Sequence, residues 1–160
     1  MATKETRVGL LTHSEMYERH SHELVRFATS LVGPSDAADV VQEAVAALIA
    51  SNRLDEAENP RALMYRAVLV RAKSMQRSAF RRRRREQRFA ESIVVTDPER
   101  RPDVVAAVVR LSPQQKACVF LAYWEDMTTG QIADRLGIAE GTVKVHLARA
   151  RERLRKVIGE

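Results

Sequence analysis

The chain has 160 residues, of which 45% are hydrophobic and 30% charged, enough to bury one ordinary core or two small ones. Its net charge of +6 and its pI near 10.0 indicate a polyanionic partner. The single cysteine, Cys118, excludes an internal disulfide and a cysteine-rich zinc site, and its apolar helical context predicts a buried packing thiol. No apolar run approaches the ~20 residues that cross a bilayer, and no signal-peptide core opens the chain, so we expect a cytoplasmic protein.

Three helices are predicted in the N-terminal half of the chain. Apolar residues at helical spacing predict the first over residues 14–32 and the second over residues 35–51, with the helix-breaking pair Gly33-Pro34 between them. The third begins at Asn59-Pro60, because asparagine is a suitable N-cap and proline fits the first helical position.

The C-terminal half contains two helix starts with the same signature. The segments SPQQ (residues 112–115) and TTGQ (residues 128–131) each place a hydroxyl at the N-cap and a glutamine three residues later, which is a capping box. Three valines between residues 104 and 108 predict a short helix before them, and a longer helix is expected from about residue 139. Between residues 86 and 103 the apolar pattern weakens and two prolines occur, which predicts a linker.

The end of the chain has the layout of a helix-turn-helix. Ala133 is small where two helices must cross closely, Gly137 stands where the first helix must end with a positive φ, and Val143 anchors the second helix on the first. We therefore predict an all-α fold with two small helical domains, residues 14–85 and residues 104–158. A flexible linker at residues 86–103 joins them, and the second domain carries the helix-turn-helix.

The last helix separates into an apolar face and a basic face. At about 100° per residue the expected core positions are Val143, Leu147, Ala150 and Leu154. The opposite positions, which would be available to a DNA major groove, are Lys144, Val145, Ala148 and Arg149. Arg151 and Arg153 belong to a further basic group that would meet phosphates. A basic solvated helix at the end of a bundle is the alternative interpretation.

The third helix has a basic face that begins well before its run of five arginines. The basic positions on that face are Arg66, Lys73, Arg77 and Arg84, with Arg81 beside them. Residues 81–85 span more than one helical turn, so only two of the five arginines continue the face. Tyr65 and Phe80 lie between the basic and apolar faces. They could stack on unpaired bases or complete the edge of the core, and the sequence leaves both interpretations open.

The second helix carries a polar and mostly acidic surface beside its apolar stripe. The residues of this surface are Asp36, Asp39, Gln42 and Glu43. In a chain this basic, such a surface favours a positively charged protein partner. For the two aspartates, a favourable interaction with the helix dipole is a sufficient alternative.

Taken together, these segments resemble a bacterial RNA polymerase sigma factor of the short extracytoplasmic-function (ECF) type, similar to the SigE-like subgroup of actinobacteria. The matching segments are DAADVVQEAVAAL (residues 36–48), NPRALMYRAVLVRA (residues 59–72) and LSPQQKACVFLAYWEDMTTGQIADRLGIAEGTVKVHLARARERLRK (residues 111–156). They occur in the family's order and cover nearly the whole chain from about residue 16 to residue 157. The resemblance implies a transcription initiation factor that binds core RNA polymerase, recognises two promoter elements and promotes DNA melting.

The resemblance also implies roles for individual residues. The residues expected to dock on the β′ clamp helices are Asp36, Asp39, Gln42 and Glu43. Those expected to hold the minus-ten element and the melted strand are Asn52, Arg61, Tyr65, Arg66, Lys73, Arg77, Phe80, Arg81 and Arg84. Those expected to read the minus-thirty-five element are Thr142, Lys144, Val145, Ala148, Arg149, Arg151 and Arg153, on a domain that rests on the β flap. An anti-sigma factor is a common further partner in the family.

The sequence also departs from the family's pattern and leaves rival functions to weigh. Ala139 stands where relatives often have a serine or threonine that caps the recognition helix. The VKVHL segment (residues 143–147) fits the Val-Lys-x-His-Leu pattern that also occurs in LuxR-type regulators, but the helices before it do not alternate with strands. A basic nucleoid or RNA-binding protein is a second alternative, and it leaves the acidic surface unexplained. The absence of a phosphate loop, paired catalytic carboxylates or metal-ligand spacing argues against an enzyme, a metal site or a cofactor.

Overall fold

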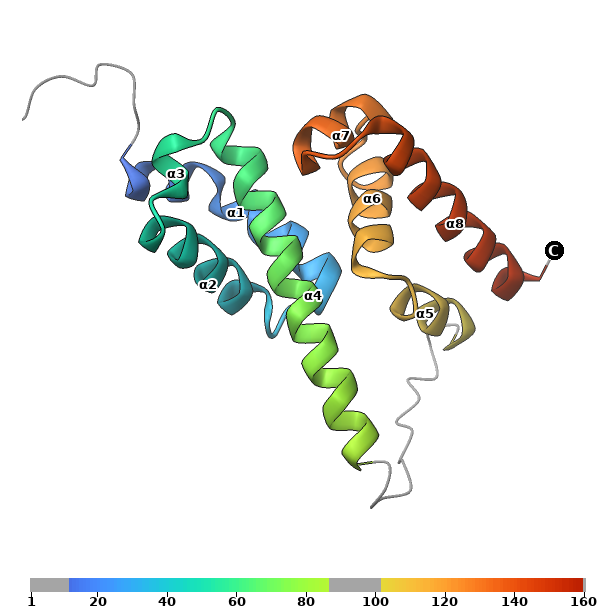
Figure 1. The fold of residues 1–160 in the computed structure, drawn as a ribbon. Coiled ribbons are helices and arrows are strands. Elements are labelled where there is room, and N and C mark those ends of the chain that lie inside the picture. The colour runs from blue at the N-terminus through green and yellow to red at the C-terminus, as the bar shows by residue number, and fades with distance from the viewer. Residues whose placement is uncertain (1–11, 87–101, 160) are drawn as a thin grey trace, which may run out of the picture.

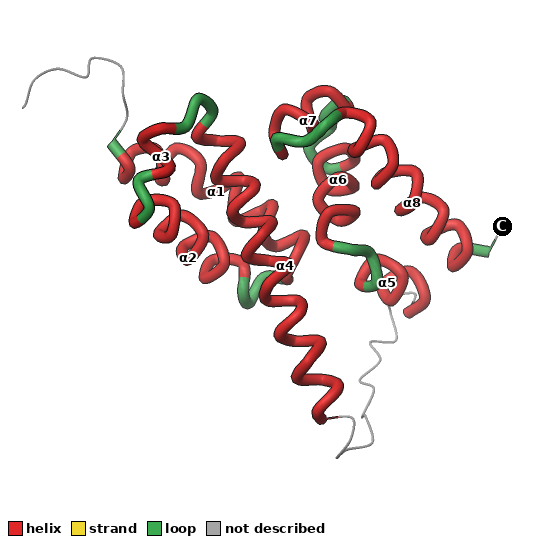
Figure 2. The backbone as a smooth tube through the Cα atoms, viewed as in Figure 1, coloured by secondary structure: helices red, strands yellow, loops and turns green. Residues whose placement is uncertain are grey.

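The computed structural model describes residues 12–86 and 102–159, and within those ranges the chain is helical without a strand (Figure 2). The helices are α1 (His13–Val32), α2 (Ala37–Ala50), α3 (Arg53–Glu56), α4 (Pro60–Glu86), α5 (Pro102–Val109), α6 (Pro113–Tyr123), α7 (Thr129–Leu136) and α8 (Glu140–Ile158). The predicted all-α fold is confirmed. The four-residue helix α3 was not expected, because the sequence suggested only a loop there.

Helices α1 to α4 form an N-terminal bundle in which α1, α2 and α4 contact one another. A capping box starts α1, since the Thr12 hydroxyl accepts from the Glu15 N–H at 3.2 Å while the Glu15 carboxylate accepts from the Thr12 N–H at 2.8 Å. Gly33 ends the helix with a φ of 86°. As predicted, the Asn59 side chain caps α4, accepting from the Ala62 N–H at 3.1 Å.

Helices α5 to α8 form a C-terminal bundle in which α8 packs against the other three. Both predicted capping boxes are present, with Ser112 at the start of α6 and Thr128 at the start of α7. Gly137 ends α7 in the left-handed conformation at φ 63°, as the helix-turn-helix layout requires. Ala139 is the N-cap of α8 and, lacking a side-chain acceptor, leaves the first turn without a side-chain cap.

The two bundles pack against each other rather than standing apart (Figure 1). Helix α1 contacts α6, and α4 contacts both α6 and α7, so the buried residues of the two bundles form one continuous apolar cluster. The Phe27 ring on α1 lies at this junction, with its centroid 4.8 Å from that of Tyr65 on α4 and 6.4 Å from that of Phe120 on α6. Cys118 is fully buried in the same cluster, and burial raises the pKa of its thiol to about 11.

The expected linker at residues 86–103 lies almost entirely outside the described residues, which stop at Glu86 and resume at Pro102. Before that gap, the last turns of α4 extend past the other helices of the N-terminal bundle (Figure 1). The side chains of residues 81–86 are all exposed there. The arginine run is therefore the end of a continuous helix that begins at Pro60 and is packed in the core over its first half.

Candidate nucleic-acid interface

The exposed face of α8 carries the residues predicted to read duplex DNA. Val143, Leu147 and Ala150 are buried against the rest of the C-terminal bundle, which confirms most of the predicted core stripe. The predicted contact residues are all exposed: Thr142, Lys144, Val145, Ala148, Arg149, Arg151 and Arg153. Because α8 follows the glycine turn after α7, this face has the position of a recognition helix.

Two of these residues also hold the C-terminal bundle together, which the sequence did not suggest. The Arg151 guanidinium donates to the Tyr123 hydroxyl at 2.9 Å. That of Arg153 donates to the backbone carbonyl of Arg110 at 3.1 Å and to the Gln115 side chain at 3.4 Å. Both arginines therefore tie α8 to earlier helices of the bundle. Their expected role as phosphate contacts stays a prediction.

His146 is half-buried on α8, between the exposed contact residues and the core stripe. Its Nδ1 is buried, and no hydrogen-bond partner for it is present among the described residues. Burial lowers the pKa of His146 below its ordinary value of 6.5, and the positive charges of Arg149 and of Lys73 on α4 lower it further. The folded chain therefore disfavours the protonated imidazole.

The basic face of α4 is open to solvent over most of its length. Arg66, Arg77, Arg81 and Arg84 are exposed, and Lys73 is half-buried, with burial and the Arg77 charge lowering its pKa. Phe80 is 61% exposed, and the Arg84 guanidinium lies 6.0 Å from the centre of its ring. An exposed ring beside cations suits stacking on an unpaired base. The contact with DNA itself stays a prediction.

Tyr65, predicted between the basic and apolar faces of α4, lies in the interior of the structure. It is 2% exposed, and its ring has the Phe27 ring of α1 and the Arg135 guanidinium of α7 as neighbours. The sequence left open whether Tyr65 stacks on bases or completes the edge of the core. With the two bundles packed together, Tyr65 occupies a core position. Burial raises the pKa of its hydroxyl to about 12.

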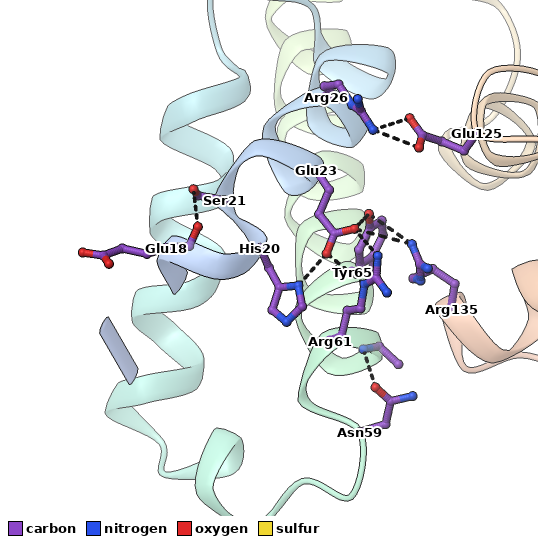
Figure 3. Close-up of polar contacts among 11 residues, drawn as sticks. Glu18, His20, Ser21, Glu23, Arg26, Asn59, Arg61, Tyr65, Glu125 and Arg135 are labelled. Atoms are coloured by element: carbon purple, nitrogen blue, oxygen red, sulfur yellow. Dashed lines mark hydrogen bonds and ion pairs between the residues drawn. The ribbon is translucent and has the colours of Figure 1, made fainter. Parts of the chain in front are cut away.

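Glu23 on α1 organises the polar groups around Tyr65 (Figure 3). Its carboxylate accepts hydrogen bonds from Arg61 Nη2 and, at 2.8 Å, from Arg61 Nε. It accepts a third hydrogen bond from the Tyr65 hydroxyl at 3.2 Å. It also contacts His20 at 2.5 Å. Burial alone raises the pKa of Glu23, but the hydrogen bonds from Arg61 and His20 outweigh it and hold that pKa below its ordinary value.

Arg135 of α7 reaches the same carboxylate from the other bundle. Its Nη1 lies 3.7 Å from the Glu23 carboxylate and 3.4 Å from the Tyr65 hydroxyl, and its guanidinium lies 5.0 Å from the centre of the Tyr65 ring. Sequence reasoning missed both Glu23 and Arg135. Neither belongs to a local motif, and the two become neighbours only when the bundles pack.

The acidic surface of α2 is exposed as predicted. Asp36, Asp39, Gln42 and Glu43 all face solvent, and the Glu43 carboxylate accepts from Arg71 Nε at 2.6 Å. Asp36 is the N-cap of α2 but makes no side-chain capping bond, so capping does not account for that aspartate. Asn52, expected near the minus-ten element, is exposed after α2 in a left-handed conformation at φ 57°.

A cleft of about 520 Å³ lies between the start of α4 and helix α7. Asn59 and Arg61 line one side, and Asp134 and Arg135 line the other. The cleft is polar, and it adjoins the Glu23 cluster (Figure 3). Within the two described ranges no group of three or more potential ligands could hold a metal ion.

Comparison with known proteins assigns a family to each bundle. The model for sigma-70 region 2 matches residues 16–89, and the model for sigma-70 region 4 matches residues 102–154. The ECF RNA polymerase sigma factor SigL of Mycobacterium tuberculosis is 31% identical over 91% of this chain and 88% of its own length. The chain belongs to the ECF sigma factors.

Two further relatives agree with this assignment. The RNA polymerase sigma-E factor of Streptomyces coelicolor is 30% identical over 93% of this chain and 88% of its own. The crystal structure of the sigma factor RpoE from Bartonella quintana, in complex with the anti-sigma factor NepR, matches with a TM-score of 0.56 at 25% identity. That match covers 91% of this chain and 95% of the other.

As an ECF sigma factor, the chain is a transcription initiation factor that binds core RNA polymerase and recognises promoters. The LuxR-type and nucleoid-protein alternatives are not favoured. Members of this family are transcription factors rather than enzymes, and the chain fits that description. None of the helices in the described ranges is both long and apolar enough to span a membrane.

Proposed function

We propose that this ECF sigma factor reads the minus-thirty-five element through the exposed face of α8 and holds the minus-ten element with the N-terminal bundle. The observation that carries the first part is the glycine turn at Gly137, after which α8 turns a basic face to solvent and an apolar face to the bundle. Lys144 and Arg149 are the charged residues of that face. Side chains at these positions suit direct contact with bases and phosphates in a major groove.

For the minus-ten element, the exposed part of the α4 basic face supports the proposal. Arg77 and Arg81 line a hollow with the exposed Phe80 ring, and Arg84 lies over that ring, which combines phosphate attraction with a stacking platform. Asn52 and Arg61 stand at the two ends of the segment that leads into α4, where a flipped base would be captured. Tyr65 joins this set only when α7 moves away from α4.

The acidic surface of α2 is the proposed site for the β′ clamp helices. Asp39 is exposed and makes no ion pair with any residue in the described ranges, so its charge is available to a partner. The Glu43 carboxylate forms an ion pair with Arg71. The C-terminal bundle would rest on the β flap. Complementary charge of this kind speeds encounter and orients the partner.

The remaining assignments follow from family membership. The similar structure from Bartonella quintana contains an anti-sigma factor, and this supports a partner of that class for the present chain. A sigma factor acts beside RNA polymerase in the cytoplasm and needs neither a cofactor nor a catalytic residue. The domain boundaries, residues 14–85, 86–103 and 104–158, are part of this proposal.

Reversal of charge on the acidic surface tests the docking site. Asp39→Lys should weaken binding to core polymerase roughly tenfold, because it replaces an attraction with a repulsion at the interface. Glu18→Lys on α1 is a suitable control, since it makes a similar reversal at an exposed site outside that surface. Titration of labelled chain with core polymerase measures both. Equal losses in the two variants, or none in either, would reject the docking face.

A further inference from the structure

An acidic side chain lies at the start of α8, although the residues predicted to read DNA on this helix are basic or uncharged. Glu140 is the first residue of α8 and precedes Lys144 by four positions, so the two side chains are neighbours on the helix surface. Both are exposed. The N-terminal residues of a recognition helix are those that contact base edges in the major groove. Glu140 therefore has a position from which it can contact a base beside the one that Lys144 meets.

The Glu140 carboxylate is oriented through only one of its two oxygens. Its Oε1 accepts a hydrogen bond from the hydroxyl of Thr129, the first residue of α7, at 2.7 Å. The same oxygen lies 3.8 Å from Lys144 Nζ. The other oxygen, Oε2, makes no hydrogen bond or ion pair within the described ranges. One oxygen thus fixes the direction of the side chain, and the other is left as an acceptor for a ligand.

A carboxylate on this surface lowers the affinity for DNA in general. It repels the phosphates that the arginines of α8 attract, and it does so whatever the base sequence. Its exposed ion pair with Lys144 adds little to helix stability, because pairs of this kind are weak. A residue that weakens binding to most sequences can still raise specificity, because only a sequence that offers it a partner offsets the repulsion.

We propose that Glu140 is a specificity-determining residue, whose Oε2 accepts a hydrogen bond from the N4 amino group of a cytosine in the minus-thirty-five element. In the major groove, cytosine presents a donor, and a carboxylate is an acceptor without donors. Adenine also presents an amino group, but its N7 acceptor lies beside that group and repels the carboxylate. The inference deepens the proposed function and rests on the reading of this element by α8.

Two substitutions separate a base contact from a purely structural role. In Glu140→Gln, Thr129 and Lys144 both donate to the amide oxygen, so the amide NH₂ group takes the place of Oε2. A donor there cannot pair with the cytosine amino group but suits guanine, whose edge presents two acceptors. The preferred base at one position should therefore change from cytosine to guanine. In Glu140→Ala no polar group remains, and the preference for cytosine should fall about tenfold.

The test uses the full chain bound to core polymerase and a library of promoter duplexes randomised over the minus-thirty-five element. The parent promoter is one at which the wild-type complex starts transcription, and the retained duplexes are sequenced. Glu152→Gln is the matched control, because it removes the same charge from an exposed site on the same helix. Glu152 also pairs with a lysine four positions on, Lys156, at 3.1 Å. Lys144→Ala tests the reading by α8 itself.

We expect the wild type to retain cytosine at one position, Glu140→Gln to retain guanine there, and Glu152→Gln to select like the wild type. If Glu140 served only the helix dipole and the contact with Thr129, both Glu140 variants would keep the wild-type preference, which would overturn the inference. A selected element without a G·C pair would overturn it too. A wild type without any preferred bases, or with preferences that Lys144→Ala leaves unchanged, would instead contradict the proposed function of α8.

Discussion

At the scale of single residues, the fold shifts the ionisation of Glu23 on α1 and of His146 on α8. Hydrogen bonds from Arg61 and His20 lower the pKa of Glu23 and favour its carboxylate, whereas burial and the charges of Arg149 and Lys73 lower the pKa of His146 and favour its neutral imidazole. The sequence predicts neither property, because both depend on residues distant along the chain. Glu23 is 38 positions from Arg61, and Lys73 lies on a different helix from His146.

His146 gives a pH dependence whose sign can be worked out. Its folded pKa is below the ordinary value of 6.5, so the unfolded chain binds a proton more readily. Stability is therefore fully present above pH 6.5 and falls as the pH drops from there through the lower folded pKa. His146→Gln should remove this component, so the free energy of unfolding should fall less between pH 7.5 and pH 5.5 in the variant.

Urea unfolding at the two pH values measures the difference between the variant and the wild type. His22→Gln is a matched control, because it makes the same substitution at an exposed site on α1. A His146→Gln profile that coincides with that of the wild type would show that this imidazole does not titrate differently in the folded chain.

At the scale of helices, local sequence signals predict most of what is found. The capping boxes at Ser112 and Thr128 and the glycine end of α7 involve residues no more than four apart, so the sequence contains them whole. Helix α3 was not predicted, because no local sequence signal marks it. It has four residues and follows a left-handed Asn52, so it carries no apolar period to detect.

The start of α8 offers a test at this scale. Ala139 has the extended conformation of an N-cap, with φ −69° and ψ 143°, but no side-chain oxygen. Ala139→Ser should supply the missing acceptor and raise the free energy of unfolding by about 1 kcal/mol. In an exposed helix interior the same change should lower stability, by up to about 0.5 kcal/mol, because serine is a weaker helix former than alanine.

Ala46→Ser, exposed within α2, supplies that comparison, with urea unfolding as the measurement. Ala139→Ser should raise the free energy of unfolding, and Ala46→Ser should lower it. A loss of stability at Ala139 equal to that at Ala46 would mean that the first turn of α8 gains nothing from a hydroxyl cap.

At the scale of the whole molecule, the sequence predicts the two bundles but not the contact between them. The faces of α4 and α8 follow from helical periodicity, and most of their predicted contact residues are exposed. The interface is different, because Arg26 on α1 and Glu125 in the loop after α6 are 99 positions apart and belong to bundles that look complete on their own. For the same reason the sequence could not decide between the two interpretations of Tyr65, since the Arg135 guanidinium over its ring belongs to the other bundle.

The central claim is that this chain directs core RNA polymerase to promoters with two elements, one held by each bundle. The most direct test adds the purified chain to core polymerase on genomic DNA and maps the 5′ ends of the transcripts. We expect new start sites that share one element about ten and another about thirty-five base pairs upstream, and Lys144→Ala should reduce initiation mainly through the distal element. A chain that binds core polymerase yet yields no new start sites would contradict the claim.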